Sequence, residues 1–360
     1  MSGVLIMAGG TGGHVYPGLA VARTLRAQRV PVAWLGTRQG LEARAVPAAD
    51  SGIDMEWIAI RGVRRTGLRN WLLLPFTLAY AMIQAFRVLR RRRPDVVLSM
   101  GGFVSAPGGL VAWLLRRPLL IHEQNAVPGL TNKWLALLAD QVLCGFPGVL
   151  GARHVGNPVR REIAALAAPE QRLAGRTGRL RLLVVGGSQG ARIFNEVVPR
   201  TLPLLPPEQR PEVRHQCGRD NLTTVQQQYE SRITNHESRI RVSEFIDDMA
   251  AAYDWADVVL CRAGAMTVAE LAASGSAAIL VPYPYAVDDH QTANAQYLVR
   301  RDAAILLPQA EFTPARLGDI LRELAENREL LARMARAARG CAVTDAAETV
   351  ARLCLEAAHA

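Results

Sequence analysis

The chain has 360 residues, half of them hydrophobic, which is enough for two domains that each bury a core. A formal charge of +10 predicts an acidic partner. Aromatic residues make up only 6% and are not interleaved with basic ones, which argues against single-stranded nucleic acid as that partner. The five cysteines form no C-x-x-C pair, so we expect buried thiols in a reducing cytoplasm rather than a disulfide framework. The first apolar run begins at Val4, and no signal peptide is expected.

Apolar runs of strand length alternate with amphipathic segments of helical period along the chain. In the first half the expected strands are 4–8, 32–36, 57–60, 95–100, 118–122 and 141–144. In the second half they are 181–186, 213–217, 240–243, 257–261, 277–281 and 303–307. This alternation predicts an α/β fold of parallel sheets with crossover helices. The most polar joint, 161–180, indicates domains 1–160 and 161–344, and a helix at about 345–360 is expected to pack back on the first domain.

Two glycine-rich turns stand at matching places in the two halves. Residues 9–13 follow one predicted strand, and residues 186–190 follow another. Glycine lets the backbone turn sharply and brings N–H groups close to an anion at a helix N-terminus. Neither turn continues into Gly-Lys-Ser/Thr, and no acidic residue closes the second strand of either half. The sequence therefore predicts two anion-binding domains and argues against both ATP and NAD.

The segment 71–93 combines an apolar run with a basic end. Residues 71–86 are mostly apolar but fall short of the roughly 20 that span a bilayer, and Pro75 interrupts them. One interpretation is a core helix with a solvated basic end. The other is an interfacial surface, on which apolar side chains enter the headgroup region while Arg90–Arg93 meet anionic lipid. Further arginines upstream favour the second interpretation: Arg61, Arg64, Arg65 and Arg69.

The remaining marked segments stand where predicted strands open into loops, which is where open α/β sheets bind ligands. In the first half these are 101–109 (GGFVSAPGG) and 122–125 (HEQN), and 156–160 (GNPVR) stands at the joint. In the second half they are 244–249 (EFIDDM), 262–270 (RAGAMTVAE) and 288–295 (DDHQTANA).

This set of loops closely resembles glycosyltransferase family 28, and within it the lipid I N-acetylglucosaminyltransferases of peptidoglycan synthesis, from the first glycine turn to at least Ala295. The resemblance implies a GT-B fold, in which two Rossmann-like domains with parallel sheets face a central cleft. It implies an inverting transfer of GlcNAc from UDP-GlcNAc to the C4 hydroxyl of MurNAc in undecaprenyl-pyrophosphoryl-MurNAc-pentapeptide (lipid I), giving the β-1,4 link of lipid II. The implied setting is the cytoplasmic face of the inner membrane, where the enzyme is peripheral. Its expected partners are then the two substrates, the anionic membrane surface and proteins of cell-wall synthesis, with no nucleic acid and no cofactor.

The resemblance also implies roles for individual residues. Ser188 with the second glycine turn, and Arg160 at the joint, match diphosphate contacts, while the backbone of Ile246 matches the position that reads uracil. Glu270 matches the ribose contact, although a carboxylate near a helix start can also be a capping residue. The full set of expected UDP-GlcNAc contacts is Thr11, Gly12, Gly13, Asn125, Arg160, Ser188, Ile246, Ala265, Met266, Thr267, Val268, Ala269, Glu270 and Gln291. The candidates for the acceptor and its pyrophosphate are Gly10, Gly102, Phe103 and Ser105, and Phe103 stands where relatives often carry Tyr.

The sequence contains no D-x-D motif for a bridging metal, so no metal site is expected. The departing UDP must then be stabilised by helix N-termini, backbone N–H groups and arginine. Inversion by single displacement needs a group that takes the proton from the acceptor hydroxyl. His14 is the expected base, because it ends the first glycine turn at a helix start and titrates in the right range. The alternative is that His14 binds the acceptor pyrophosphate or caps the helix, while His122 continues an apolar strand and is expected to be structural.

Two other functions share these glycine turns. A non-catalytic nucleotide-sugar scaffold at the membrane would bind UDP-GlcNAc without turning it over. A UDP-sugar epimerase of the same fold would act without an acceptor, but the segment 71–93 argues against it, because a soluble epimerase does not need a membrane surface.

Overall fold

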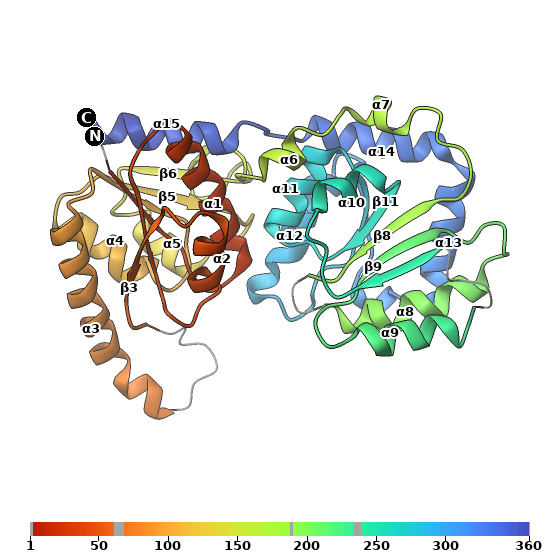
Figure 1. Ribbon diagram of the computed structural model, residues 1–360, viewed down its shortest axis with the longest axis horizontal. Coiled ribbons are helices and arrows are strands. Elements are labelled where there is room, and N and C mark those ends of the chain that lie inside the picture. Colours follow the sequence, from red (N-terminus) through yellow and green to blue (C-terminus); the bar gives the residue numbers. More distant parts are fainter. Residues whose placement is uncertain (1–2, 61–67, 188–189, 234–238, 360) are drawn as a thin grey trace. The chain divides into compact units, whose positions relative to one another are not determined.

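The computed structural model describes residues 3–60, 68–187, 190–233 and 239–359. Ser188, Arg61, Arg64 and Arg65 lie outside these residues. The chain forms two compact units (Figure 1): unit 1 is Met1–Arg160 with Val343–Ala360, and unit 2 is Arg161–Ala342.

Among the described residues, unit 1 holds a parallel sheet of seven strands in the order β3-β2-β1-β4-β5-β6-β7. These strands are β1 Val4–Met7, β2 Val32–Gly36, β3 Asp54–Trp57, β4 Val96–Ser99, β5 Leu119–Glu123, β6 Gln141–Cys144 and β7 Arg153–His154. The helices are α1 Gly12–Ala27, α2 Glu42–Ala49, α3 Leu68–Arg92, α4 Ser105–Leu114, α5 Leu130–Leu135 and α15 Ala346–Ala358. The last of these contacts α1 (Figure 1) and also β4.

Both faces of the unit 1 sheet are buried, and the alternation of side chains along β1 separates the two cores. Val4 and Ile6 belong to the core that α1 and α15 complete. Leu5 and Met7 belong to the opposite core, which contains residues of α3 and α4. Burial on both faces explains why these strands are continuous apolar runs in the sequence.

Unit 2 repeats this plan with a parallel sheet, which in the described part of the chain has six strands in the order β10-β9-β8-β11-β12-β13. The strands are β8 Arg181–Val185, β9 Glu212–Gln216, β10 Ile240–Ser243, β11 Val258–Cys261, β12 Ala277–Leu280 and β13 Ala304–Leu306. The α-helices are α6 Arg161–Ala164, α7 Pro169–Leu173, α8 Arg192–Thr201, α9 Leu222–Glu230, α10 Met249–Trp255, α11 Ala265–Ser274, α12 His290–Val299, α13 Pro314–Glu326 and α14 Arg328–Gly340. Short 3-10 turns lie at Leu202–Leu204, Val287–Asp289 and Gln309–Glu311.

The strand predicted at 57–60 is wrong, because β3 runs three residues earlier, Asp54–Trp57. The apolar run that suggested the later position marks burial rather than strand pairing: Ile58 is buried in the core that contains residues of α3. β7 was not predicted, because its two residues are exposed and carry no apolar signal.

The helix α3 has an unusual division of its apolar side chains. Small or aliphatic residues such as Ala81, Ala85 and Val88 face the core. Larger ones point outward: Phe76 is 73% exposed and Ile83 is 50% exposed. Among the helices of the described residues, none is long and apolar enough to cross a membrane.

The basic end of α3 is exposed, and two of its arginines also bind β3. Arg92 donates to Glu56 at 2.6 Å and to Asp54 at 2.6 Å, and Arg91 also pairs with Glu56. Both carboxylates lie on β3, so these two arginines serve the fold. Arg87 and Arg90 are exposed.

Candidate functional site

Each sheet has a switch point at which the strand order reverses direction. In unit 2 it lies between β8 and β11, which pair side by side although α8, β9, α9, β10 and α10 separate them in the chain. The loops that leave such neighbouring strands diverge and open a crevice at the carboxyl edge of the sheet. Here those loops are the second glycine turn and Arg262–Gly264.

The second glycine turn needs glycine for two separate reasons. Gly187 and Gly190 have φ values of +82° and +72°, a region that L side chains rarely adopt. A Cβ at Gly190 would also lie 2.2 Å from the carbonyl oxygen of Cys217. The turn therefore approaches the end of β9 with no room for a side chain.

The start of α11 supplies hydrogen-bond donors to the same crevice. Its N-cap is Gly264, which has no side chain to cap the helix. The N–H of Val268 donates to the carbonyl of Gly264 at 2.9 Å, whereas the first three helical residues have no intrahelical acceptor. Ala265, Met266 and Thr267 thus direct backbone donors outward, the arrangement that binds anions. Val268 is fully buried and its N–H is already used, and Ala269 follows it on the half-exposed side of the helix.

Glu270 lies beyond the first turn of α11, which contains no acidic residue, so the capping alternative does not apply. Its carboxylate accepts a hydrogen bond from the Tyr253 hydroxyl at 3.1 Å. Tyr253 is itself fully buried and stands on α10. This contact holds a half-exposed carboxylate in place beside the donor helix.

Ile246 lies in the loop between β10 and α10. The neighbouring Asp248 is the N-cap of α10 and accepts from the N–H of Ala251 at 2.9 Å, which fixes the loop to the helix. No other described residue hydrogen-bonds to the backbone of Ile246. Its peptide groups can therefore meet a ligand.

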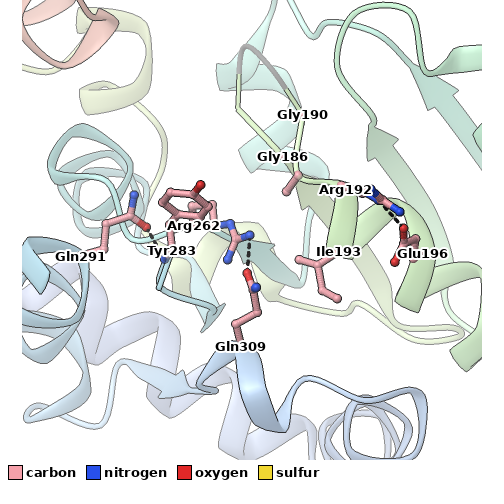
Figure 2. Close-up of a pocket in the computed structure, with 10 residues that line it drawn as sticks. Gly186, Gly190, Arg192, Ile193, Glu196, Arg262, Tyr283, Gln291 and Gln309 are labelled. Atoms are coloured by element: carbon pink, nitrogen blue, oxygen red, sulfur yellow. Dashed lines mark hydrogen bonds and ion pairs between the residues drawn. The ribbon is translucent and has the colours of Figure 1, made fainter. Parts of the chain in front are cut away.

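A cavity of about 380 Å³ lies beside the second glycine turn (Figure 2). It is lined by Gly186, Gly190, Ala191, Arg192, Ile193, Glu196, Arg262, Tyr283, Gln291 and Gln309. Of the individually expected UDP-GlcNAc contacts that the structure describes, only Gln291 lines this cavity, together with Gly186 and Gly190 of the second glycine turn. The cavity thus extends from the glycine turn to the start of α12, where Gln291 stands.

Arg262 organises one wall of this cavity. Its guanidinium donates to the carbonyls of Val281 and Pro282 at 3.1 and 3.2 Å and to Gln309 Oε1 at 2.7 Å. It also stacks over the Tyr283 ring, 5.4 Å from the ring centre. This one side chain therefore joins the end of β11 to the segment that follows β12, and Figure 2 shows its bond to Gln309.

The hydrogen bond of Gln291 fixes the direction of its carboxamide. Gln291 Oε1 accepts from the backbone N–H of Tyr283 at 2.9 Å. Because a backbone N–H is only a donor, the oxygen of the carboxamide must face it. The amide NH₂ is then the end of Gln291 that remains for a ligand (Figure 2).

The switch point of unit 1 lies between β1 and β4. The first glycine turn follows β1, and a second pair of glycines follows β4. A Cβ at Gly102 would lie 2.3 Å from the carbonyl oxygen of Gly9, and one at Gly101 would lie 3.0 Å from the His14 ring. The two turns therefore touch, and His14 lies against them.

His14 stands in the first turn of α1, with Nδ1 3.2 Å from the hydroxyl of Thr11. Burial lowers the pKa of His14 below 6.5, and this effect is opposed by the carboxylate of Glu123, by a backbone hydrogen bond at Gly9 and by the carboxylate of Glu42. The imidazole is thus neutral near pH 7. When Nδ1–H donates to Thr11, Nε2 keeps the lone pair that a base needs.

The candidates for the acceptor pyrophosphate have different surroundings. The N–H of Gly10 donates to Glu42 Oε2 at 3.1 Å, and Ser105 is fully buried with its hydroxyl donating to the carbonyl of Gly101. Both groups are occupied within the fold. Gly102 lies against the first glycine turn, and the Phe103 ring covers Gly10. Gly12 and Gly13 at the start of α1 are half-buried and Thr11 is exposed, so this part of the turn can reach a ligand.

The loop after β5 is organised by the buried carboxylate of Glu123. It accepts from the backbone N–H groups of Asn125 and Gly129 at 2.9 and 3.0 Å and from the side chain of Asn132 at 2.8 Å. Asn125 is thereby placed at the carboxyl edge of the sheet. Arg160 is half-buried at the end of unit 1.

His122 occupies a structural position. It is fully buried, and its Nε2 lies 2.8 Å from the carbonyl oxygen of Gly156. Burial lowers its pKa to about 4, against the opposing effects of the Gly156 hydrogen bond and Glu123. The ring connects the end of β5 to the segment that leads out of unit 1.

Three residues that organise these crevices were not singled out from the sequence: Glu42, Tyr253 and Arg262. Glu42 and Tyr253 lie outside the glycine turns and carry no local motif. Arg262 begins the 262–270 segment, and its position directly after a buried strand was the available signal. Among the described residues there is no cluster of three His, Cys, Asp or Glu side chains that could hold a metal ion.

Two Rossmann-like units, each with a glycine turn at its switch point, define a GT-B fold. Models of the N-terminal and C-terminal domains of glycosyltransferase family 28 match residues 4–144 and 181–350. A crystal structure of MurG from Acinetobacter baumannii is 39% identical with a TM-score of 0.85, covering 99% of this chain and 100% of that one. The calicheamicin glycosyltransferase CalG4, 17% identical with a TM-score of 0.68, covers 99% of this chain and 98% of its own and shares the fold.

Two curated relatives carry the name UDP-N-acetylglucosamine–N-acetylmuramyl-(pentapeptide) pyrophosphoryl-undecaprenol N-acetylglucosamine transferase. The one from Alkalilimnicola ehrlichii is 56% identical, covering 99% of both chains. The one from Marinobacter nauticus is 53% identical, covering 99% of this chain and 97% of its own. The chain belongs to glycosyltransferase family 28.

Proposed function

We propose that the protein is an inverting hexosyltransferase that moves GlcNAc from UDP-GlcNAc to the C4 hydroxyl of MurNAc in lipid I and so forms lipid II. The observation that carries this proposal is the identity of 56% over 99% of the chain with a relative named for the reaction. The glycine turns, the HEQN loop and the EFIDDM loop that suggested it all stand at carboxyl edges of the sheets.

Unit 2 is the proposed donor domain. The free N–H groups at the start of α11 and the second glycine turn suit the diphosphate, since both present backbone donors to an anion. The backbone of Ile246 suits the uracil edge, and Glu270 suits the ribose hydroxyls. Gln291 then donates from its NH₂ to an oxygen of the sugar. Ser188 and Arg160 complete the proposed diphosphate contacts.

Unit 1 is the proposed acceptor domain, with His14 as the base. The neutral imidazole can take the proton from the acceptor hydroxyl as its oxygen attacks the anomeric carbon. The carboxylates of Glu123 and Glu42 then favour the imidazolium that forms. Thr11, Gly12, Gly13 and Asn125 remain the proposed substrate contacts of this unit.

We also propose that unit 1 docks peripherally on the cytoplasmic face of the membrane. Exposed apolar side chains gather on three helices that contact in the order α3, α4, α5. They are Phe76, Tyr80, Ile83 and Phe86 on α3, Trp113 and Leu114 on α4, and Leu130 and Trp134 on α5. Arg87 and Arg90 are available for anionic lipid, whereas Arg91 and Arg92 are bound to β3.

The reaction is tested by UDP release from UDP-GlcNAc with a soluble short-chain analogue of lipid I. Release that depends on the acceptor supports the proposal. Consumption of UDP-GlcNAc without acceptor would indicate an epimerase, and binding without turnover would indicate a scaffold. His14→Ala should lower kcat about 10²–10⁴-fold while UDP affinity is unchanged. A loss of kcat below tenfold would exclude His14 as the base.

A further inference from the structure

Glu42 is a fully buried carboxylate at the start of α2. Its Oε1 accepts from both the backbone N–H and the hydroxyl of Thr37, each at 2.8 Å, and its Oε2 accepts from the N–H of Gly10 at 3.1 Å. Two of these partners are backbone N–H groups, which can only donate, so each carboxylate oxygen accepts a hydrogen bond from the backbone. The first glycine turn therefore holds a carboxylate that belongs to the protein itself.

Three glycines leave the room that this carboxylate occupies. A Cβ at Gly9, Gly36 or Gly40 would lie 2.8, 2.6 or 2.1 Å from the Glu42 side chain. None of the three is among the glycines with positive φ, so their backbone conformations do not require glycine. Close approach to Glu42 is the reason that the structure gives for glycine at these positions.

The corresponding place in unit 2 has the opposite polarity. The end of β9 corresponds to the end of β2, and there Gln216 Nε2 donates to the carbonyl of Gly187 at 2.8 Å. A carbonyl of the second glycine turn thus accepts from a neutral amide, whereas an N–H of the first glycine turn donates to a carboxylate. Two turns that read alike in the sequence differ in charge.

We propose that Glu42 is a positioning residue of the transferase, an internal anion that fixes the first glycine turn beside His14. This inference rests on the proposed function. Glu42 touches no substrate: it acts through the hydrogen bond to Gly10 on the turn and through its charge on the imidazole. The groups that face His14 are Glu42 from α2, Glu123 from β5, the hydroxyl of Thr11 and the backbone at Gly9 and Gly101.

The test is Glu42→Gln, which keeps the shape and removes the charge. A carboxamide has one oxygen, so either the Thr37 donors or the Gly10 N–H must face its NH₂. Leaving a buried N–H unsatisfied costs enough to predict a fall in kcat/KM for the acceptor of about tenfold. UDP affinity should stay within about twofold of the parent, because the proposed uracil and ribose contacts, Ile246 and Glu270, lie in unit 2.

The pH dependence of the acceptor kcat/KM tests the effect of the Glu42 charge, through its acid limb, which is the fall of kcat/KM towards low pH. Glu42 raises the pKa of His14, so in Glu42→Gln that pKa falls. A base works in its neutral form, so the acid limb should move to lower pH. A purely structural defect would lower the whole profile without moving it.

Glu56→Gln is the matched control. It removes another buried carboxylate from unit 1, one that binds Arg91 and Arg92 and has no contact with the glycine turn. It should keep the parent's acid limb on a soluble acceptor. The proposal is overturned if Glu42→Gln leaves both the acid limb and the acceptor kcat/KM unchanged, or if Glu56→Gln reproduces its effects.

The two proposals fail in different ways. If His14→Ala keeps its activity, His14 is not the base and the acid limb reports another group. The contrast between acceptor kcat/KM and UDP affinity in Glu42→Gln then still decides whether Glu42 positions the turn.

Discussion

Substitution of Gln291 by Glu tests how the sugar is read. In the structure Gln291 Oε1 accepts from the N–H of Tyr283 at 2.9 Å, and the NH₂ end remains for a ligand. A glutamate keeps the Tyr283 bond with one oxygen and presents the other oxygen to the sugar. The change therefore converts a donor into an acceptor without altering the shape of the side chain.

The magnitude follows from the bond that is lost. A polar group left without its partner costs about 1–3 kcal/mol, and each 1.4 kcal/mol is tenfold in affinity. We therefore expect UDP-GlcNAc to bind about 5- to 150-fold more weakly to Gln291→Glu. UDP lacks the sugar and should lose much less, so the ratio of the two dissociation constants isolates the sugar contact.

Isothermal titration with UDP and with UDP-GlcNAc gives that ratio. Gln309→Glu is the control for added charge, because Gln309 lines the same cavity and accepts from Arg262 rather than facing the sugar. Its ratio should match that of the parent. Equal losses of UDP and UDP-GlcNAc affinity in Gln291→Glu, or the same change of ratio in Gln309→Glu, would refute the placement of the sugar at Gln291.

The remaining predictions concern the ribose, the metal, the membrane and the stability. Glu270→Ala should weaken UDP binding by about 1.5–3 kcal/mol in calorimetry; an unchanged affinity contradicts the ribose contact. Excess chelator should leave turnover largely intact; complete loss that one divalent ion restores would contradict metal-independent departure of UDP. Replacing Phe76 and Ile83 by Ser should reduce binding to anionic vesicles but spare activity on a soluble acceptor; equal vesicle binding would exclude this surface. Burial lowers the pKa of His215 to about 3. Between this value and 6.5 the unfolded chain binds a proton that the folded chain does not, so the free energy of unfolding falls as the pH falls. In urea unfolding, the parent should lose about 2 kcal/mol of its free energy of unfolding between about pH 7.5 and pH 5 through this histidine, and His215→Gln should not show that part of the loss. An identical loss in both proteins contradicts this.

The sequence predicts the fold well because both faces of each sheet are buried. The apolar runs of β1 and β8 have no polar alternation, so strand and glycine turn can be read directly. At the edge of the sheet this signal weakens. β3 carries the polar residues Asp54 and Glu56 that bind α3, and the apolar residues after it misplaced the strand.

The site is less predictable, because its organising contacts join residues that are distant in the chain. Glu42 reaches Gly10 across 32 positions, and Tyr253 reaches Glu270 across 17. A motif shows which turn can bind an anion, but not which of its N–H groups are already used. For this reason Gly10 and Ser105 read as ligand contacts in the sequence, although the structure uses their polar groups internally.

The two halves of the chain show how one architecture can serve the two ends of a transfer reaction. The departing UDP gains negative charge, and unit 2 offers backbone donors at α11 together with the second glycine turn. The proposed base gains positive charge, and unit 1 places Glu42 and Glu123 around His14. In the proposed reaction, fixed groups of opposite sign would stabilise the two charges as they develop, without rearrangement at the moment of reaction. Exchange of these polarities would oppose both developing charges, the negative charge on UDP and the positive charge on the imidazole, so in the proposed chemistry the carboxylate behind the first glycine turn matters as much as the donors of the second.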